Sequence, residues 1–161
     1  MPQVKNKIII NLILAFSIFA ILAAYFIQYV LGHQPCNLCL IERVPYIFSI
    51  TIILICLFNQ KFEKITLVVL SLTFFIGASL SFYHFGIEQG FFKESLVCDL
   101  NESNNALTKE DLLKQLKEVP ISCKDVTFKI FSLSLATINI IISLIISAIT
   151  IKLFLNYEKN K

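Results

Sequence analysis

The sequence has few charged side chains: lysine, arginine, aspartate and glutamate make up only 16% of its 161 residues, whereas 57% are hydrophobic. A soluble domain of this size carries roughly 25% charged residues, so the composition excludes an ordinary soluble domain. The chain also has no tryptophan. Phenylalanine and tyrosine must therefore take the aromatic positions that membrane proteins place at the two interfaces.

The sequence also lacks the motifs that hold several common redox groups. It contains no glycine-rich dinucleotide motif, no CxxCH haem attachment motif and no cysteine run of the iron–sulfur type. Its basic residues are not clustered as nucleic acid binding requires. These absences exclude the usual nucleotide, haem and iron–sulfur oxidoreductases, and we expect no nucleic acid partner.

Four apolar blocks take up most of the chain, each about the 20 residues that a bilayer-spanning helix needs. Because helices satisfy their own backbone groups in lipid, we expect an all-α membrane protein. It would be a four-transmembrane-helix bundle forming a single domain over residues 1–161. The first block exceeds the 7–15 apolar residues of a signal peptide, which favours a retained helix. The expected spans are about 8–31, 40–58, 65–85 and 130–155.

Lysines in the short connections predict the orientation, because cytoplasmic loops are enriched in basic residues. They occur before the first block, between the second and third, and after the fourth. Both termini are therefore expected in the cytoplasm of a bacterial cell, with the protein crossing the inner membrane several times. The periplasmic loops would be about residues 32–39 and 86–129. The second of these carries a predicted short amphipathic helix over 108–119, which Pro120 ends.

Small and polar residues recur in the fourth block. These residue types favour close helix–helix packing, because small and hydroxyl side chains let transmembrane helices approach each other. The residues concerned are Ser132, Ser134, Thr137, Asn139, Ser143 and Ser147.

The stretch LGHQPCNLCLIERVPY places Cys36 and Cys39 in a CxxC motif directly before the second block. This spacing recurs in thiol–disulfide exchange sites. If the second helix starts near Cys39, its positive end lowers the pKa of that thiol, and Arg43 follows one turn later on the same face. Pro45 disfavours helical geometry just before it, so the helix is alternatively expected to begin there.

The other cysteines have different surroundings. Cys98 and Cys123 lie in the long loop, where a bond between them would stabilise the fold by roughly 3–4 kcal/mol. Zinc binding by four cysteines is disfavoured, because structural zinc sites usually combine two closely spaced ligand pairs, and we expect no metal. Cys56 lies in the middle of an apolar block, and we assign it no redox role.

Disulfide exchange only moves electron pairs between sulfur atoms, so a CxxC that oxidises other proteins needs a final electron acceptor. A quinone dissolved in the membrane fits best, since the sequence holds no motif for another acceptor. PCNLCLIER, YHFGIEQGFFKESLVC and ISCKDVTFKIFSLSLATINIIISL, in this order, closely resemble the disulfide bond formation protein DsbB family over nearly the whole chain.

The resemblance implies a mechanism and assigns roles to residues. A reduced DsbA-like, thioredoxin-fold oxidase would attack a Cys98–Cys123 disulfide, with Cys98 forming the mixed disulfide. Cys123 would then exchange with Cys36, and the freed Cys39 thiolate would contact a ubiquinone or menaquinone lined by Arg43. The protein would thus be a quinone-dependent enzyme that generates disulfides for protein folding.

Two polar positions and two rival functions stay open. His84 lies near the outer end of the third block, where it either tunes the quinone pocket or accepts a proton, or is an interfacial residue with a satisfied hydrogen bond. Glu42 is assigned no catalytic role, and the role of Glu88 is not predicted. The rivals are a non-catalytic membrane adaptor or sensor with two structural disulfides and a vitamin-K-epoxide-reductase-like enzyme. The early position of the CxxC disfavours the second.

Overall fold

The computed structural model describes residues 2–59, 62–93, 123–124, 129–130 and 133–159. Within them the chain forms α1 (Pro2–Tyr29), α2 (Asn37–Ile41), α3 (Val44–Phe58), α4 (Glu63–Glu88) and α6 (Leu135–Lys159). Two short strands, β1 (Lys129–Ile130) and β2 (Leu133–Ser134), pair antiparallel before α6. Cys98 and the predicted short helix over 108–119 lie outside the described residues.

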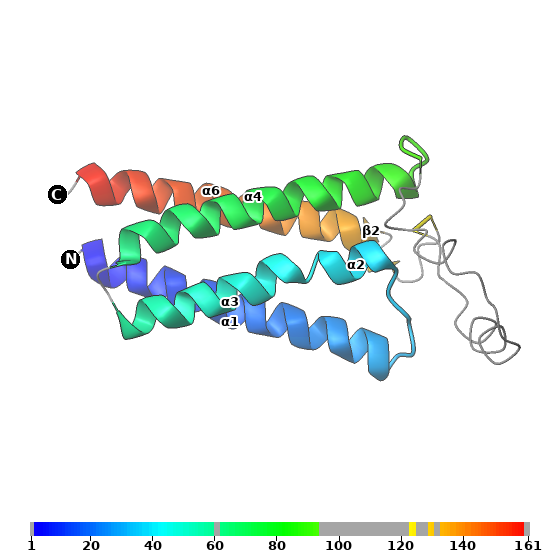
Figure 1. Ribbon diagram of the computed structural model, residues 1–161, viewed down its shortest axis with the longest axis horizontal. Helices are drawn as coiled ribbons and strands as arrows, with labels where there is room; N and C mark the ends of the chain where they lie inside the picture. The colour runs from blue at the N-terminus through cyan, green and yellow to red at the C-terminus, as the bar shows by residue number, and fades with distance from the viewer. Residues whose placement is uncertain (1, 60–61, 94–122, 125–128, 131–132, 160–161) are drawn as a thin grey trace, which may run out of the picture.

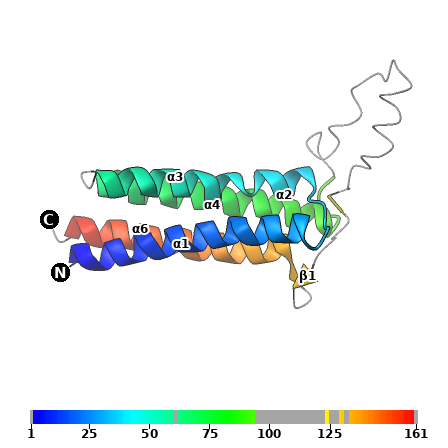
Figure 2. The same ribbon diagram turned by 90° about the horizontal axis from the view of Figure 1, so that it is seen from below.

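The helices form an elongated antiparallel bundle (Figures 1 and 2). Four segments are long and apolar enough to cross a membrane: Lys7–Tyr29, Asn37–Phe58, Glu63–Glu88 and Leu135–Tyr157. The prediction of an all-α bundle of four transmembrane helices is therefore confirmed. Both termini lie at one end of the bundle, and α2, which carries the CxxC, lies at the opposite end (Figure 1).

The predicted second span begins later than the structure places it and lacks a break that the structure shows. Helical structure starts at Asn37, stops after Ile41 and resumes at Val44, where Pro45 occupies the first turn of α3. Proline has no N–H to donate and disfavours a helical conformation in the residue before it. The interruption at Glu42 and Arg43 follows from this chemistry.

The predicted third and fourth spans also differ from the observed helices at their ends. α4 continues three residues past the expected Phe85 to Glu88, so Glu88 also lies in the helix. α6 begins at Leu135 and not at Ile130, because Ser134 caps it: the Ser134 hydroxyl accepts a hydrogen bond from the Thr137 N–H at 3.2 Å. The preceding residues pair as β1 and β2 instead of extending the helix.

The bundle is held by an apolar core and by hydroxyl pairs between helices. Ile53, Leu67 and Phe74 are fully buried, and Phe74 packs edge-on against Tyr46. Ser17 and Ser49 join α1 to α3 at 3.1 Å. The Ser147 hydroxyl donates to the Ser71 carbonyl oxygen at 3.1 Å and joins α6 to α4. The interpretation of the fourth-block serines as packing residues is confirmed for Ser147.

Candidate thiol–disulfide and quinone site

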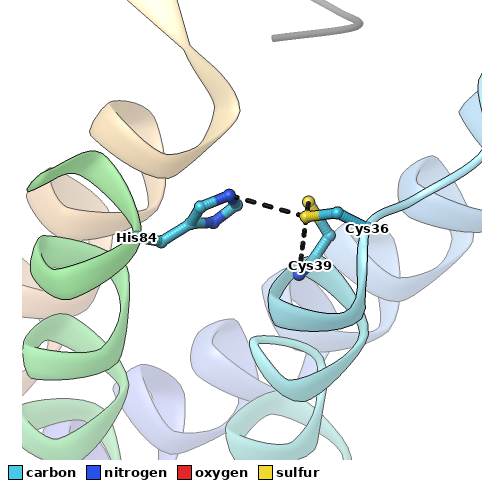
Figure 3. A group of neighbouring side chains, drawn as sticks. All are labelled: Cys36, Cys39 and His84. Carbon is cyan, nitrogen blue, oxygen red and sulfur yellow. Dashed lines mark hydrogen bonds between the residues drawn. The ribbon is translucent and has the colours of Figure 1, made fainter. Parts of the chain in front are cut away.

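The CxxC lies at the end of the bundle opposite the termini, in a turn between α1 and α3. Gly32 allows this turn, because its φ of +72° lies in the left-handed region that glycine tolerates. Cys36 then caps α2, its sulfur accepting a hydrogen bond from the Cys39 N–H at 3.4 Å. The two Sγ atoms lie 3.0 Å apart (Figure 3), so both thiols are placed to react as one unit.

The structure moves the helix start that we expected near Cys39 to Asn37. The sulfur at the helix cap is therefore that of Cys36. The neighbouring Cys39 thiol lowers the pKa of Cys36 to about 4, and the His84 ring adds to this effect, while burial of Cys36 opposes it. A low thiol pKa favours the thiolate, the form that takes part in disulfide exchange.

His84 reaches the CxxC from α4, and its ring points toward Cys36 (Figure 3). Its Nε2 lies 3.5 Å from Cys36 Sγ, and its Nδ1 lies 2.7 Å from Glu42 Oε1. Glu88, one turn further along α4, has an oxygen 3.8 Å from Nε2. The side chains of His84, Glu42 and Glu88 are all largely buried, so His84 lies between two carboxylates and a thiol.

Glu42 is held in place by a group of polar side chains from three helical segments, here named the Glu42 cluster (Glu42, Tyr46, Ser81, His84 and Asn139). Asn139 on α6 is its centre. Its Nδ2 donates to Glu42 Oε2 at 3.0 Å and to Ser81 Oγ at 2.7 Å, and its Oδ1 accepts from the Tyr46 hydroxyl. Both oxygens of Glu42 thus have partners, which a carboxylate at this depth requires.

A cavity of about 320 Å³ lies beside the CxxC. Most of its lining is apolar and comes from α1 and α6, including Phe16, Phe19, Ile27, Ile138 and Ile142. Its polar lining includes Cys39, Glu42, Arg43, Tyr46 and Asn139. The site therefore combines an apolar chamber, which suits a lipid-soluble ring compound, with one thiol and one guanidinium.

Arg43 lines this cavity as part of the break between α2 and α3. Its Nη1 donates to Gln28 Oε1 at 2.7 Å, and its guanidinium lies over the Tyr25 ring, 5.2 Å from the ring centre. Both contacts are with α1, so Arg43 ties this helix to the CxxC segment and keeps its charge at the cavity wall. His84, the third predicted cofactor-binding residue, is not among the lining residues but contacts one of them, Glu42.

The remaining cysteines divide into two groups. Cys123 is disulfide-bonded and packs in one buried cluster with Cys36, Leu38 and Ile87, so the structure places Cys123 beside the CxxC. Cys56 is a buried free thiol in α3, away from this cluster. The ligand atoms of Cys36, Cys39 and His84 lie within 4.8 Å of one another, a spacing that also suits a metal ion.

Sequence reasoning missed most of the Glu42 cluster. Glu42 was assigned no chemistry, Asn139 was interpreted as a packing residue, and Tyr46 and Ser81 were not singled out. The available signal was that Glu42 and Asn139 are polar side chains at membrane depth, where such residues are rare and usually functional. Their contacts join residues 97 positions apart, which no local pattern shows.

Known proteins resemble the chain over most of its length. Residues 6–153 match the family described as Disulfide bond formation protein DsbB. The chain is also 30% identical over 158 residues to the uncharacterized protein RP370 of Rickettsia prowazekii (strain Madrid E), covering 97% of this chain and 91% of that protein. No solved structure matches the chain.

Proposed function

Because the chain belongs to the DsbB family of disulfide bond formation proteins, we propose that it is a membrane thiol:quinone oxidoreductase. It reoxidises a periplasmic DsbA-like dithiol oxidase and passes the electrons to a quinone of the bacterial inner membrane. The observation that carries the proposal is the cavity next to the CxxC, whose wall contains both Cys39 and Arg43.

The cavity fits a quinone on three counts. Its lining is mainly apolar, as a ring with an isoprenoid tail requires. Arg43 offers N–H donors for a ring carbonyl oxygen. Cys39 supplies a sulfur atom at the same wall. A bound quinone takes up two electrons and two protons and leaves as the quinol.

The cysteines would act in sequence. A thiolate of the reduced partner attacks the disulfide that we propose between Cys98 and Cys123, and the resulting mixed disulfide resolves to release oxidised partner and two loop thiols. Cys123 then attacks Cys36 of the Cys36–Cys39 disulfide. That attack frees Cys39 at the cavity wall, and Cys98 closes the loop disulfide again by displacing Cys36. The burial of Cys123 against Cys36 supports this exchange.

The orientation would place this chemistry on the periplasmic side. The lysine distribution favours cytoplasmic termini, and the CxxC lies at the other end of the bundle (Figure 1). The bacterial periplasm is kept oxidising through a quinone-linked route, which agrees with disulfide generation at that end.

The test measures oxidation of a reduced DsbA-like protein by this protein in quinone-containing nanodiscs, with free thiols counted by an alkylating mass tag. We expect quinone-dependent oxidation by the wild type, none with Cys39→Ala, and wild-type rates with Cys56→Ala as the matched control. If the partner stays reduced with and without quinone, the disulfides are structural and the adaptor function takes its place.

A further inference from the structure

The Glu42 cluster connects two places that the proposed reaction has to link. At one end His84 Nε2 lies 3.5 Å from Cys36 Sγ, and at the other end Glu42 lines the cavity. One hydrogen bond of 2.7 Å, between His84 Nδ1 and Glu42 Oε1, joins the two ends. A continuous path of titratable groups therefore runs from a reactive sulfur to the cavity.

A structural role alone does not explain this pair. Histidines and buried carboxylates are costly at membrane depth, and they are found there mainly in proton or ion pathways. Glu42 lies where Pro45 interrupts the helix, and its side chain is 10% exposed. An apolar residue there would spare the cost of burying a charge.

We propose that His84 and Glu42 relay protons from the CxxC thiols to the acceptor in the cavity. This inference rests on the proposed quinone function. When the CxxC is oxidised, two S–H bonds break, one S–S bond forms, and two electrons and two protons leave. The acceptor takes both electrons and both protons and gains two O–H bonds.

The geometry assigns one of the two protons to the relay. The proton that Cys36 gives up on ionising is held at His84 Nε2, and as the CxxC is oxidised the ring releases its Nδ1 proton to Glu42 Oε1. Glu42 then gives a proton to the acceptor and returns to the carboxylate. Cys39 lines the cavity itself, so its proton needs no relay.

Several other groups face this pair and set its charge. Glu88 on α4 lies 3.8 Å from His84 Nε2, and its second oxygen is buried with no hydrogen-bond partner in the part of the chain that the structure describes. Asn139 on α6 donates to Glu42, and Arg43 follows Glu42 directly. The two carboxylates next to the ring are therefore positioned to balance the proton that it carries in the relay.

The first experiment needs no quinone. In reduced protein that retains only the two CxxC cysteines, the thiolate absorbance near 240 nm is titrated against pH. His84→Gln is expected to raise the pKa of Cys36 by about one unit, because it removes the ring whose hydrogen bond and charge stabilise the thiolate. Glu63→Gln is the matched control: it removes a buried carboxylate from the opposite end of α4 and should leave the titration unchanged.

The second experiment separates thiol exchange from quinone reduction in one reaction. Reduced DsbA-like partner is mixed with the protein and ubiquinone in nanodiscs, and mixed-disulfide formation and quinol appearance are followed separately. We expect Glu42→Gln to slow quinol formation about 100-fold with mixed-disulfide formation at the wild-type rate. Quinol formation by Glu42→Gln should be slower still in D₂O. Glu42→Asp, which keeps a carboxylate, should restore part of the rate of quinol formation.

The outcomes distinguish the relay from the function on which it rests. If Glu42→Gln and His84→Gln both form quinol as fast as the wild type does, the relay is wrong and the quinone function stands. If Glu63→Gln slows quinol formation as much as Glu42→Gln, loss of any buried carboxylate has the same effect, and the relay is again wrong. If the wild type forms no quinol, the proposed function itself fails.

Discussion

Asn139→Leu tests how much the Glu42 cluster contributes to the stability of the bundle. Leucine has nearly the size of asparagine but makes none of its hydrogen bonds. The substitution removes the bonds to Glu42, to Ser81 and from Tyr46, and a weaker one from Ser143 at 3.4 Å.

The expected loss follows from these contacts. Hydrogen bonds between transmembrane helices contribute about 0.6 kcal/mol each on average, and a bond to a carboxylate contributes about 1.5–3 kcal/mol. Together they predict a free energy of unfolding lower by about 3 kcal/mol. For a chain of 161 residues this corresponds to a melting temperature lower by about 6–12 °C.

The assay is equilibrium unfolding in mixed micelles of increasing SDS content, followed by circular dichroism. Ser147→Ala is the control on the same helix, because it removes one interhelical bond, to the Ser71 carbonyl, and should cost about 0.6 kcal/mol. If Asn139→Leu costs no more than Ser147→Ala, the cluster does not stabilise the bundle and our reasoning about Asn139 is wrong.

Three further predictions concern the CxxC, the cavity and the helix packing. The pKa of Cys36 lies at about 4 against an ordinary 9.0, so its thiolate should persist at neutral pH and disappear as the pH falls through about 4. The stability that this ionisation gives the reduced protein is complete above pH 9, declines as the pH falls below 9, and is gone below about 4. A 240 nm titration of the thiolate with its midpoint near pH 9 would contradict this. Arg43→Ala should raise the KM for quinone about tenfold or more, since a charge-assisted hydrogen bond contributes about 1.5–3 kcal/mol. Mass tagging should still find the disulfides formed in this variant. An unchanged KM for quinone would mean that Arg43 does not bind it. Gly77→Leu should destabilise the bundle by about 1–3 kcal/mol in the same SDS titration, because even a Cβ added at Gly77 would lie 3.3 Å from Pro45 Cγ. Gly77→Ala should cost less. Equal costs for the two substitutions would mean that α3 and α4 do not meet closely there.

The fold could be predicted from the sequence because the lipid environment leaves few alternatives. Apolar length alone identifies four helices, and backbone hydrogen bonding requires that they be helices. The helix ends were predicted less well. α6, capped by Ser134, begins five residues past the expected start, and the break before Pro45 separates α2 from α3. Both features depend on single side chains and not on hydropathy.

The candidate site could be predicted only in part for a related reason. Cys36, Cys39 and Arg43 lie within eight positions of one another, so their spacing already predicts that they share one site. Asn139 and Ser81 come from other helices, and only the packing of α4 on α6 places them beside Glu42. The sequence therefore pointed to the cysteines and Arg43 but not to the polar side chains of the Glu42 cluster that lie beside them.

The cavity is walled by two helices, α1 and α6, that make few contacts with each other. Arg43 anchors α1 near the CxxC through Gln28 and Tyr25, and the rest of the wall on α1 and α6 is formed mainly by apolar side chains. A quinone that reaches the cavity through this wall never has to leave the bilayer. The rate of its reduction would then depend on the mole fraction of quinone among the lipids and on lateral diffusion, and dilution of the membranes in buffer would not change it.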